Sequence, residues 1–330
     1  MLKQFPTFRS RTLLFLVAAM ISSPARAQDV AADTPIDLPK PANVRIFSDL
    51  SYVDAGYPRQ KLDLYLPFPV PAKPVPAILF IHGGGWERGS KADGRRFAFR
   101  MVAQGYAVAC VDYRLSSDEL FPAQIEDCKV AVRWLRANAT RYRLDPEHIG
   151  VLGVSAGGYL AVLLGTTRAT VLFDVDAHSD QSSAVQAVCN FSGPTDLVRL
   201  YDHSVSAQTP QAAEVVRLLG GNPHVQKLAA QKSHPGAYLE GNASPFLLVH
   251  GTEDTLVPPS QSRLLYDIFV KLSIPVHLHL IHGAGHTGPA FVAPEINAMV
   301  DDFFTRNLKP GQLPGEPGTA FITESNAVEN

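Results

Sequence analysis

The deciding stretch of this sequence is GVSAGG, residues 153–158. It directly follows the short apolar run 149–152 and precedes an apolar helical pattern. A Gly-x-Ser-x-Gly segment between a strand and a helix is typical of a nucleophile elbow, a sharp turn that exposes the serine hydroxyl. The flanking positions must be glycine because side chains there would collide with the neighbouring strand and helix. Ser155 is therefore the predicted nucleophile, and the prediction depends on finding its partners.

On both sides of this stretch, short apolar runs alternate with longer helical patterns. This alternation predicts βαβ units, and hence an α/β fold with a mostly parallel sheet and helices on both faces. An alternating pair of segments at 44–53 and 61–66 predicts an antiparallel N-terminal hairpin, which gives eight strands in all. The other expected strands lie at 77–81, 107–111, 149–152, 185–188, 246–249 and 276–281, and the expected helices at about 94–104, 123–139, 155–165, 260–272 and 293–308.

The composition along the chain divides it into segments. Residues 44–308 are expected to form one catalytic domain, preceded by a flexible lead-in at 28–43. The segment 198–243 breaks the strand–helix rhythm, with one short helical run at 212–219, and is a possible small cap insertion over the site. Residues 309–330 are rich in proline and glycine in their first half and are expected to be disordered.

The first 27 residues have the pattern of a signal peptide. Three basic residues precede the apolar run 13–21, and Ala25-Arg26-Ala27 offers a cleavage site before Gln28. The run is too short to span a bilayer, and no later stretch reaches the required length of about 20 apolar residues. We therefore expect an exported protein, periplasmic or secreted, whose mature form has no membrane span.

A glycine-rich loop, HGGGW at residues 82–86, closes one of the expected central strands. Esterases with a nucleophile elbow carry such a segment near the reacting carbonyl, where backbone N–H groups form an oxyanion hole. Glycine lets the peptide come within hydrogen-bond reach of the substrate oxygen without a Cβ in the way. The expected donors are Gly84, Gly85 and Ala156, with His82 and Trp86 supporting the loop.

The acid and the base follow the serine in the chain order Ser, acid, His. Asp254 lies after the expected strand 246–249, and His286 lies after the strand 276–281. His286 would take the proton of the serine hydroxyl, and Asp254 would fix the tautomer of the imidazole. The neighbouring Glu253 and the earlier Asp196 are rivals for the acid, and His282 is a rival for the base.

The net charge and the spacing of the histidines bear on two other classes of function. The net charge of −2 and pI near 6.6 give no electrostatic reason to expect a nucleic-acid partner. The close spacing of His277, His279, His282 and His286 raises a metal hypothesis, but no His-Glu-x-x-His motif or cysteine pair supports it. We therefore expect no metal and no cofactor.

The chain has three cysteines, which are too few for a disulfide framework. Cys110 and Cys189 lie in strand-like runs and Cys128 in a helical pattern, so buried free thiols are expected. One disulfide remains possible in an oxidising compartment.

As a set, these motifs resemble the α/β-hydrolase fold esterases. The similarity is greatest to acetyl xylan and feruloyl esterases, within the wider carboxylesterase and hormone-sensitive-lipase group. It covers residues 52–308 and also includes the motifs LDLYLP at 62–67, DYRL at 112–115, FPA at 121–123 and HG at 250–251. The resemblance implies a serine esterase that forms an acyl-enzyme on Ser155. Its substrates would be short-acyl or feruloyl esters, as small molecules or attached to polysaccharide.

Two features of this chain differ from the hormone-sensitive-lipase group, and two alternative functions stay open. The hormone-sensitive-lipase group usually has an acidic residue where this chain has Val154, and it begins with a helical cap where this chain has the hairpin. Kynurenine formamidase is similar around residues 82–86, so an amidase, formamidase or peptidase-like hydrolase on the same scaffold is an alternative. A non-catalytic binding module is a second alternative, although it would be expected to have lost part of the triad or of the oxyanion loop.

Overall fold

The computed structural model describes Met1 and residues 39–168, 170–239, 243–309, 311 and 320–327. Apart from Met1, the predicted signal peptide lies outside the described residues, and so do residues 28–38 of the predicted lead-in. None of the helices in these described ranges is long and apolar enough to cross a membrane. The described residues from 39 onward belong to one compact unit.

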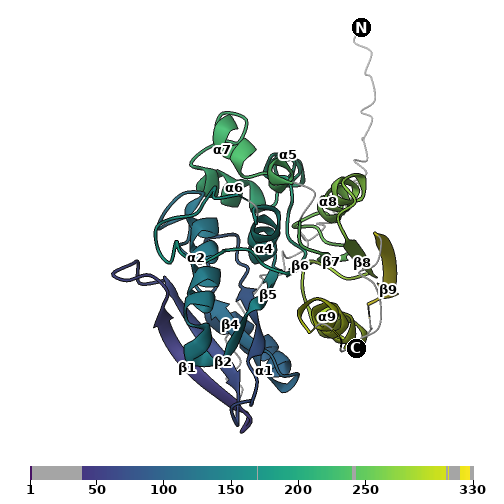
Figure 1. Ribbon diagram of the computed structural model, residues 1–330. Coiled ribbons are helices and arrows are strands. Elements are labelled where there is room, and N and C mark those ends of the chain that lie inside the picture. The colour runs from purple at the N-terminus through teal and green to yellow at the C-terminus, as the bar shows by residue number, and fades with distance from the viewer. Residues whose placement is uncertain (2–38, 169, 240–242, 310, 312–319, 328–330) are drawn as a thin grey trace. The chain divides into compact units, whose positions relative to one another are not determined.

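Nine strands in the described ranges form one sheet, in the order β1-β2-β4-β3-β5-β6-β7-β8-β9 (Figure 1). The hairpin strand β2 pairs antiparallel with both β1 and β4, and every other neighbouring pair is parallel. This confirms the predicted α/β-hydrolase architecture. The strands are β1 Val44–Ser51, β2 Lys61–Pro67, β3 Val75–Ile81, β4 Ala107–Val111, β5 Leu144–Val154, β6 Ala187–Phe191, β7 Phe246–Gly251, β8 Val276–His282 and β9 Phe321–Asn326.

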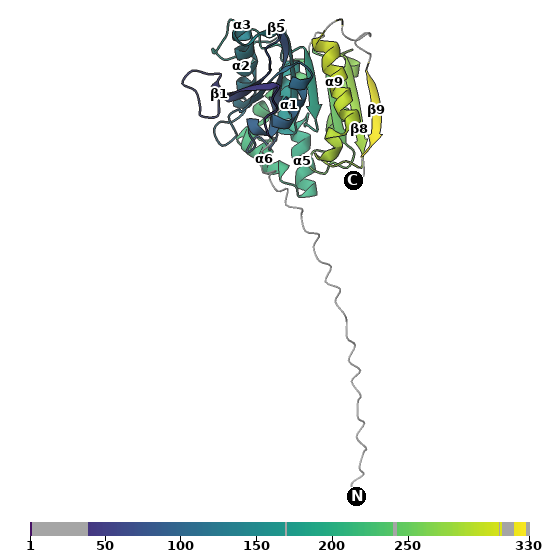
Figure 2. The ribbon, with the colours of Figure 1, turned by 90° about the horizontal axis from the view of Figure 1, so that it is seen from below.

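Two predictions are wrong, because residues 321–326 form an additional strand, β9. The sheet has nine strands in the described ranges where eight were predicted, and this part of the predicted disordered tail is a strand. This strand lies parallel to β8 at the edge of the sheet, as Figure 2 shows, with His277 opposite Phe321 and His282 opposite Asn326. The proline and glycine residues at 310–318 suggested disorder for the whole tail. However, the Thr323 hydroxyl lies 2.6 Å from Nε2 of His277 and 2.7 Å from Nδ1 of His279, so β9 supplies partners that β8 lacks by itself.

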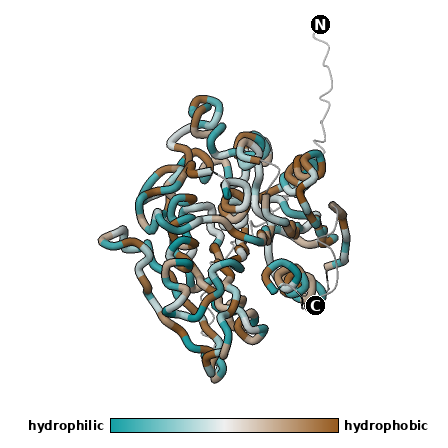
Figure 3. The backbone as a smooth tube through the Cα atoms, in the orientation of Figure 1, coloured by the Kyte–Doolittle hydropathy of each residue, from teal (hydrophilic) through white to brown (hydrophobic). Residues whose placement is uncertain are grey.

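Helices cover both faces of the sheet. Figure 1 shows α1 and α9 on one side of the strands and α4 and α8 on the other, and Figure 2 looks onto the α1 and α9 side. Figure 3 shows brown hydrophobic stretches along the strands. The helices around the sheet are α1 Arg95–Ala103, α2 Ala123–Ala137, α3 Ala139–Tyr142, α4 Ala156–Thr166, α8 Ser260–Lys271 and α9 Pro294–Leu308, with short 3-10 turns η1 Lys91–Gly94 and η3 Pro289–Val292.

The two-residue period of the strands divides the core into two parts. In β3, Leu79 and Ile81 belong to the cluster that contains the inner residues of α2, α4 and α8. Ile78 and Phe80 alternate with them and belong to the cluster under α1 and α9. All seven residues of β3 are buried, as expected for a central strand covered on both faces.

The insertion at 198–243 is more helical than expected. Only the run 212–219 was predicted to be helical, and it corresponds to α6. Helix α5 was missed, although Asp196 caps it and Leu197, Leu200 and Ser204 form its buried stripe. Figure 1 groups α5, α6 and α7, drawn in green, on the same side of the sheet as α4. The elements of the insertion are α5 Leu197–Ala207, α6 Gln211–Leu219, α7 Lys227–Lys232 and η2 Pro235–Tyr238.

Candidate active site

The predicted site residues all follow the carboxyl ends of parallel strands. Ser155 comes directly after β5, Asp254 three residues after β7, and His286 four residues after β8. The loop that begins at His82 follows β3 in the same way. Because the carboxyl ends of parallel strands lie at one edge of a sheet, the topology brings these loops together.

Ser155 lies in the strained backbone conformation of an elbow, with φ 55° and ψ −120°. Two close approaches require glycine around it. A Cβ on Gly153 would lie 2.0 Å from the carbonyl oxygen of Gly157, and a Cβ on Gly157 would lie 2.1 Å from that of Ile81. The serine N–H donates to the carbonyl oxygen of Phe191 at 2.7 Å, which ties the elbow to β6. The chain thus stabilises a conformation that a non-glycine residue rarely adopts.

His286 lies between the serine and the aspartate. Its Nε2 is 2.8 Å from Oγ of Ser155, and its Nδ1 is 2.6 Å from Oδ2 of Asp254. Since an ionised carboxylate can only accept, Nδ1 carries the hydrogen, and Nε2 is free to accept from the serine hydroxyl. This is the arrangement that a serine nucleophile and its general base need.

Asp254 is buried, and four donors surround its carboxylate. Oδ1 accepts from the backbone N–H groups of Leu256 and Val257, both at 2.9 Å. Oδ2 accepts from His286 and from Nε2 of His250, at 3.1 Å. Burial by itself would raise the pKa of Asp254, but the hydrogen bonds from the two histidines outweigh it and lower the pKa to about 2. The carboxylate therefore stays charged beside His286.

The role of His250 was not predicted. Its Nε2 also lies 2.8 Å from the carbonyl oxygen of Val257, and its Nδ1 lies 2.7 Å from the hydroxyl of Ser262. With two acceptors around Nε2, the hydrogen is on that nitrogen, and Nδ1 accepts from the serine. The only sequence signal was the four-residue spacing between His250 and Asp254. His250 therefore helps to fix the same carboxylate oxygen that faces His286.

The structure separates the rival residues from this cluster. Asp196 accepts from the N–H groups of Val198 and Arg199 as the cap of α5. Glu253 is exposed. His282 is exposed as well, and its Nε2 lies 2.8 Å from the carboxylate of Glu324 on β9.

The segment 82–89 contains two of the predicted oxyanion donors, is called the oxyanion loop below for that reason, and begins beside the serine. A Cβ on Gly83 would lie 3.3 Å from Cβ of Ser155. Gly84 and Gly85 have φ values of +104° and +60°, a region that favours glycine. Ala156, the third expected donor, is the first residue of α4. The loop and the first turn of α4 thus lie on two sides of the serine.

His82 and Trp86 anchor this loop at its start and in its middle. Nδ1 of His82 donates to the carbonyl oxygen of Gly83 at 2.8 Å, and the ring stacks on Tyr113 with centroids 4.3 Å apart. Burial lowers the pKa of His82 to about 4, so the ring is neutral at pH 7. Trp86 is 2% exposed and packs edge to face on Tyr159 of α4.

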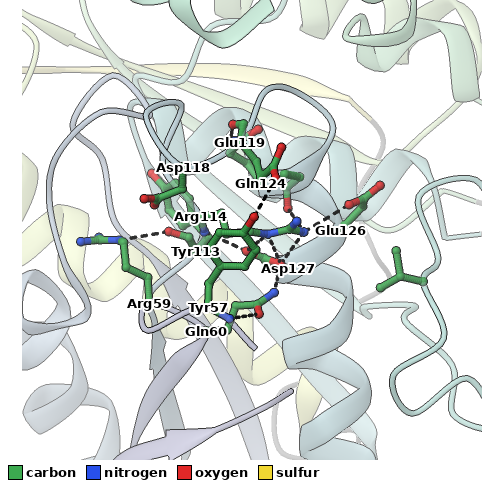
Figure 4. A network of polar contacts seen from close by, with 12 residues as sticks. Tyr57, Arg59, Gln60, Tyr113, Arg114, Asp118, Glu119, Gln124, Glu126 and Asp127 are labelled. Atoms are coloured by element: carbon green, nitrogen blue, oxygen red, sulfur yellow. Dashed lines mark hydrogen bonds and ion pairs between the residues drawn. The ribbon is translucent and has the colours of Figure 1, made fainter. Parts of the chain in front are cut away.

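A polar network joins the segment after β4, helix α2 and the turn of the hairpin (Figure 4). Arg114 contacts the carboxylate of Asp127 through Nε and Nη2, at 3.0 and 2.8 Å, and Gln60 donates to the same carboxylate at 2.7 Å. Arg59 donates to the carbonyl oxygens of Tyr113 and Gly89, at 3.2 and 2.8 Å. The hairpin turn therefore braces the end of the oxyanion loop.

Two further histidines, on β8, contact β9, and the three cysteines are buried. His277 and His279 share the Thr323 hydroxyl on β9, and no group of three His, Cys, Asp or Glu suited to a metal occurs within the described ranges. Cys110, Cys128 and Cys189 are free and buried.

The chain is similar to known esterases in sequence. The sequence profile of the BD-FAE family matches residues 62–269. Esterase LipC of Mycobacterium tuberculosis is 31% identical over 242 residues, which are 69% of this chain and 57% of that protein. The chain spans between about half and three-fifths of the length of the curated relatives it matches.

Solved structures of carbohydrate esterases have the same fold. A bifunctional GH43-CE protein of Bacteroides eggerthii superposes with a TM-score of 0.71 and 31% identity, over 80% of this chain and 35% of that one. A truncated carbohydrate esterase from gut microbiota superposes with a TM-score of 0.70 and 26% identity, over 80% of this chain and 96% of that one.

Proposed function

Because this chain belongs to the BD-FAE family of α/β-hydrolase esterases, we propose that it is a carboxylic ester hydrolase with Ser155 as nucleophile. His286 carries the proposal, since its two nitrogens lie within 2.8 Å of Ser155 Oγ and Asp254 Oδ2. A serine hydroxyl is a weak nucleophile until an adjacent base takes its proton, and a base in this position meets that need.

The reaction proceeds in two halves. Ser155 Oγ attacks the ester carbonyl carbon while His286 Nε2 takes the hydroxyl proton, and the negative oxygen that forms accepts from the N–H groups of Gly84, Gly85 and Ala156. Collapse of this intermediate breaks the bond to the alcohol, which leaves with the proton from His286. Water, activated by His286, then attacks the acyl-enzyme and releases the acid. Asp254 stabilises the positive form of the imidazole in both halves.

The proposed substrates are short-acyl or feruloyl esters, including esters on polysaccharide. One solved structure that resembles this chain is described as a carbohydrate esterase, and another as a bifunctional GH43-CE protein. His82, which is neutral, and Trp86, which is apolar, belong to the oxyanion loop and add no charge there that would select a charged acyl group.

Ser155→Ala tests the proposal, with Ser179→Ala, a change at an exposed position, as matched control. We expect the wild type and the control to hydrolyse p-nitrophenyl acetate and to react with a fluorophosphonate probe, and Ser155→Ala to do neither. A panel of longer acyl esters, methyl ferulate and acetylated xylan then ranks the substrates. Normal hydrolysis by Ser155→Ala would overturn the mechanism, and faster cleavage of matched anilides would replace the ester by an amide.

We also propose that residues 1–27 direct export, so that the enzyme meets its ester in the periplasm or outside the cell. The basic start, the apolar run 13–21 and the small residues at 25 and 27 support this proposal. Expression of the full chain in a bacterial host should yield a periplasmic product whose intact mass is that of a chain starting at Gln28. A cytoplasmic product that keeps residues 1–27 contradicts it.

A further inference from the structure

Helix α6 of the insertion contacts the oxyanion loop through two acid–base pairs. Oε1 of Glu214 lies 3.2 Å from Nη1 of Arg88. Arg217 donates from Nη2 to Oε2 of Glu87 at 2.7 Å. Residues three apart on a helix lie on the same side, so α6 presents both charges to the loop together.

The carboxylate of Glu214 also lies against the backbone of the loop itself. A Cβ built on Gly85 would lie 2.2–2.5 Å from the Cδ and both oxygens of Glu214. The Glu214 carboxylate therefore occupies the space that a side chain at position 85 would need. Contact at this point limits how far the peptide of Gly85 can move.

The side chain of Glu214 is buried, which is unusual for a carboxylate on a surface helix. The residue is 4% exposed, and burial raises its pKa while the charge of Arg88 opposes this shift. A buried charge is destabilising unless it is paired, and the charge of Arg88, 3.2 Å away, favours the ionised form of the carboxylate there. The pair of Glu214 and Arg88 thus lies next to two of the proposed oxyanion donors, Gly84 and Gly85.

We propose that Glu214 and Arg217 are positioning residues that hold the oxyanion loop in its working conformation. They act through Gly85, Glu87 and Arg88 and touch no substrate atom. Donors in an oxyanion hole stabilise charge only when they are fixed before the reaction, and a shift of about 1 Å can lower the rate about 100-fold. The inference rests on the proposed esterase function. It makes the insertion a support for the oxyanion hole.

Glu214→Ala is the first test, with Asp301→Ala as matched control, because Asp301 pairs Arg100 between α1 and α9 and does not contact the oxyanion loop. We expect Glu214→Ala to lower kcat for p-nitrophenyl acetate by roughly ten- to 100-fold, with KM changed less than about twofold. The inhibition constant of a trifluoromethyl ketone, which forms an oxyanion on Ser155, should rise by a similar factor. Asp301→Ala should change neither quantity.

If Glu214→Ala folds poorly, variants that change the charges of the two pairs test the proposal instead. Glu214→Gln preserves the shape but removes the charge, and should give a smaller loss of kcat. Arg217→Glu places two carboxylates together and should lower kcat, whereas adding Glu87→Arg should restore it. Wild-type kcat in Glu214→Gln and in Arg217→Glu overturns the proposal, and so does a loss of kcat with an unchanged ketone inhibition constant. Absence of ester hydrolysis in the wild type would instead contradict the proposed function.

Discussion

His250 donates from Nε2 to Oδ2 of Asp254 at 3.1 Å, and the same oxygen faces His286 at 2.6 Å. One carboxylate oxygen therefore accepts from two imidazoles, one on strand β7 and one on the loop after β8. The first histidine is buried and its other nitrogen is held by Ser262, so it locks the carboxylate in place. The second histidine is the one that can exchange a proton with the serine.

Asp254→Asn is expected to lower kcat by about 10⁴-fold. An amide oxygen in the place of Oδ2 brings the NH₂ group against the backbone N–H groups of Leu256 and Val257. An NH₂ group in the place of Oδ2 leaves both imidazole N–H groups without an acceptor and favours the wrong tautomer of His286. We also expect the free energy of unfolding to fall by about 1–3 kcal/mol, because a buried donor loses its partner. Steady-state kinetics and urea unfolding measure the two effects.

Glu253→Gln is the control for this prediction, since Glu253 is adjacent in sequence but exposed. Its kcat should remain within about twofold of the wild type. Equal losses in the two variants would mean that the identity of the acid is wrong.

Gly153→Ala should prevent folding or lower the melting temperature strongly. The new Cβ would lie 2.0 Å from a backbone oxygen of the elbow, and neither segment can move without breaking β5 or α4. Overpacking of this kind is destabilising by about 1–3 kcal/mol or more. Gly285→Ala is the matched control, because a Cβ there meets nothing within 4 Å. Its melting temperature should stay close to that of the wild type, and similar melting temperatures for both variants contradict the close approach.

Thr323→Val should loosen β9. The variant keeps the shape of the side chain but removes the hydroxyl that lies 2.6 Å from His277 and 2.7 Å from His279. Loss of a partner for a buried polar group is expected to lower the free energy of unfolding by about 1–3 kcal/mol. Hydrogen exchange should become faster in residues 321–326.

Glu324→Gln is the neighbouring control, because its ion pair with His282 is about half exposed at both ends. An exposed pair contributes less than about 1 kcal/mol, so stability should hardly change. If hydrogen exchange in Thr323→Val stays at the wild-type rate, the shared hydroxyl does not hold the strand.

Stability should fall when the pH is lowered from about 6.5 to 4. Burial, followed by the charge of His279, lowers the pKa of His277 from 6.5 to about 4. As the pH falls, the unfolded chain therefore binds a proton at His277 before the folded protein does. The contribution of the neutral ring to the free energy of unfolding is complete above pH 6.5, and it decreases as the pH is lowered to about 4. Melting temperatures across this range measure the effect, and His277→Gln should flatten the slope. An equal slope in that variant would assign the pH dependence to other groups.

The central sheet and the loops after its strands were predictable from local patterns. The apolar runs of β3, β4 and β7 are continuous because both faces of these strands are covered, and this property is readable in one dimension. Ser155 was predictable from its glycines, since the close approach of backbone segments restricts residue type at fixed positions. Asp254 and His286 followed from strand order and from the order of the three residues in the chain.

The elements that sequence patterns missed depend on contacts between distant segments. Strand β9 has only six residues, four of them polar, and its pairing with β8 becomes favourable through the hydroxyls of Thr323 and Ser325, which lie 2.6–2.9 Å from ring nitrogens of His277 and His279. Glu214 resembled an ordinary polar residue of an amphipathic helix until the fold placed it against Gly85. No local pattern encodes such a contact, because the partner lies 129 residues away (214 minus 85).

The direction of β9 has a practical consequence for handling the protein. The strand runs parallel to β8, so Ala327, whose N–H donates to the carbonyl oxygen of His282 at 2.8 Å, lies at the edge of the sheet from which the His286 loop emerges. An affinity tag or fusion partner joined beyond residue 327 would start on the same side as the reacting groups. Immobilisation through that end would turn the site toward the support and would hinder polymeric substrates more than small ones.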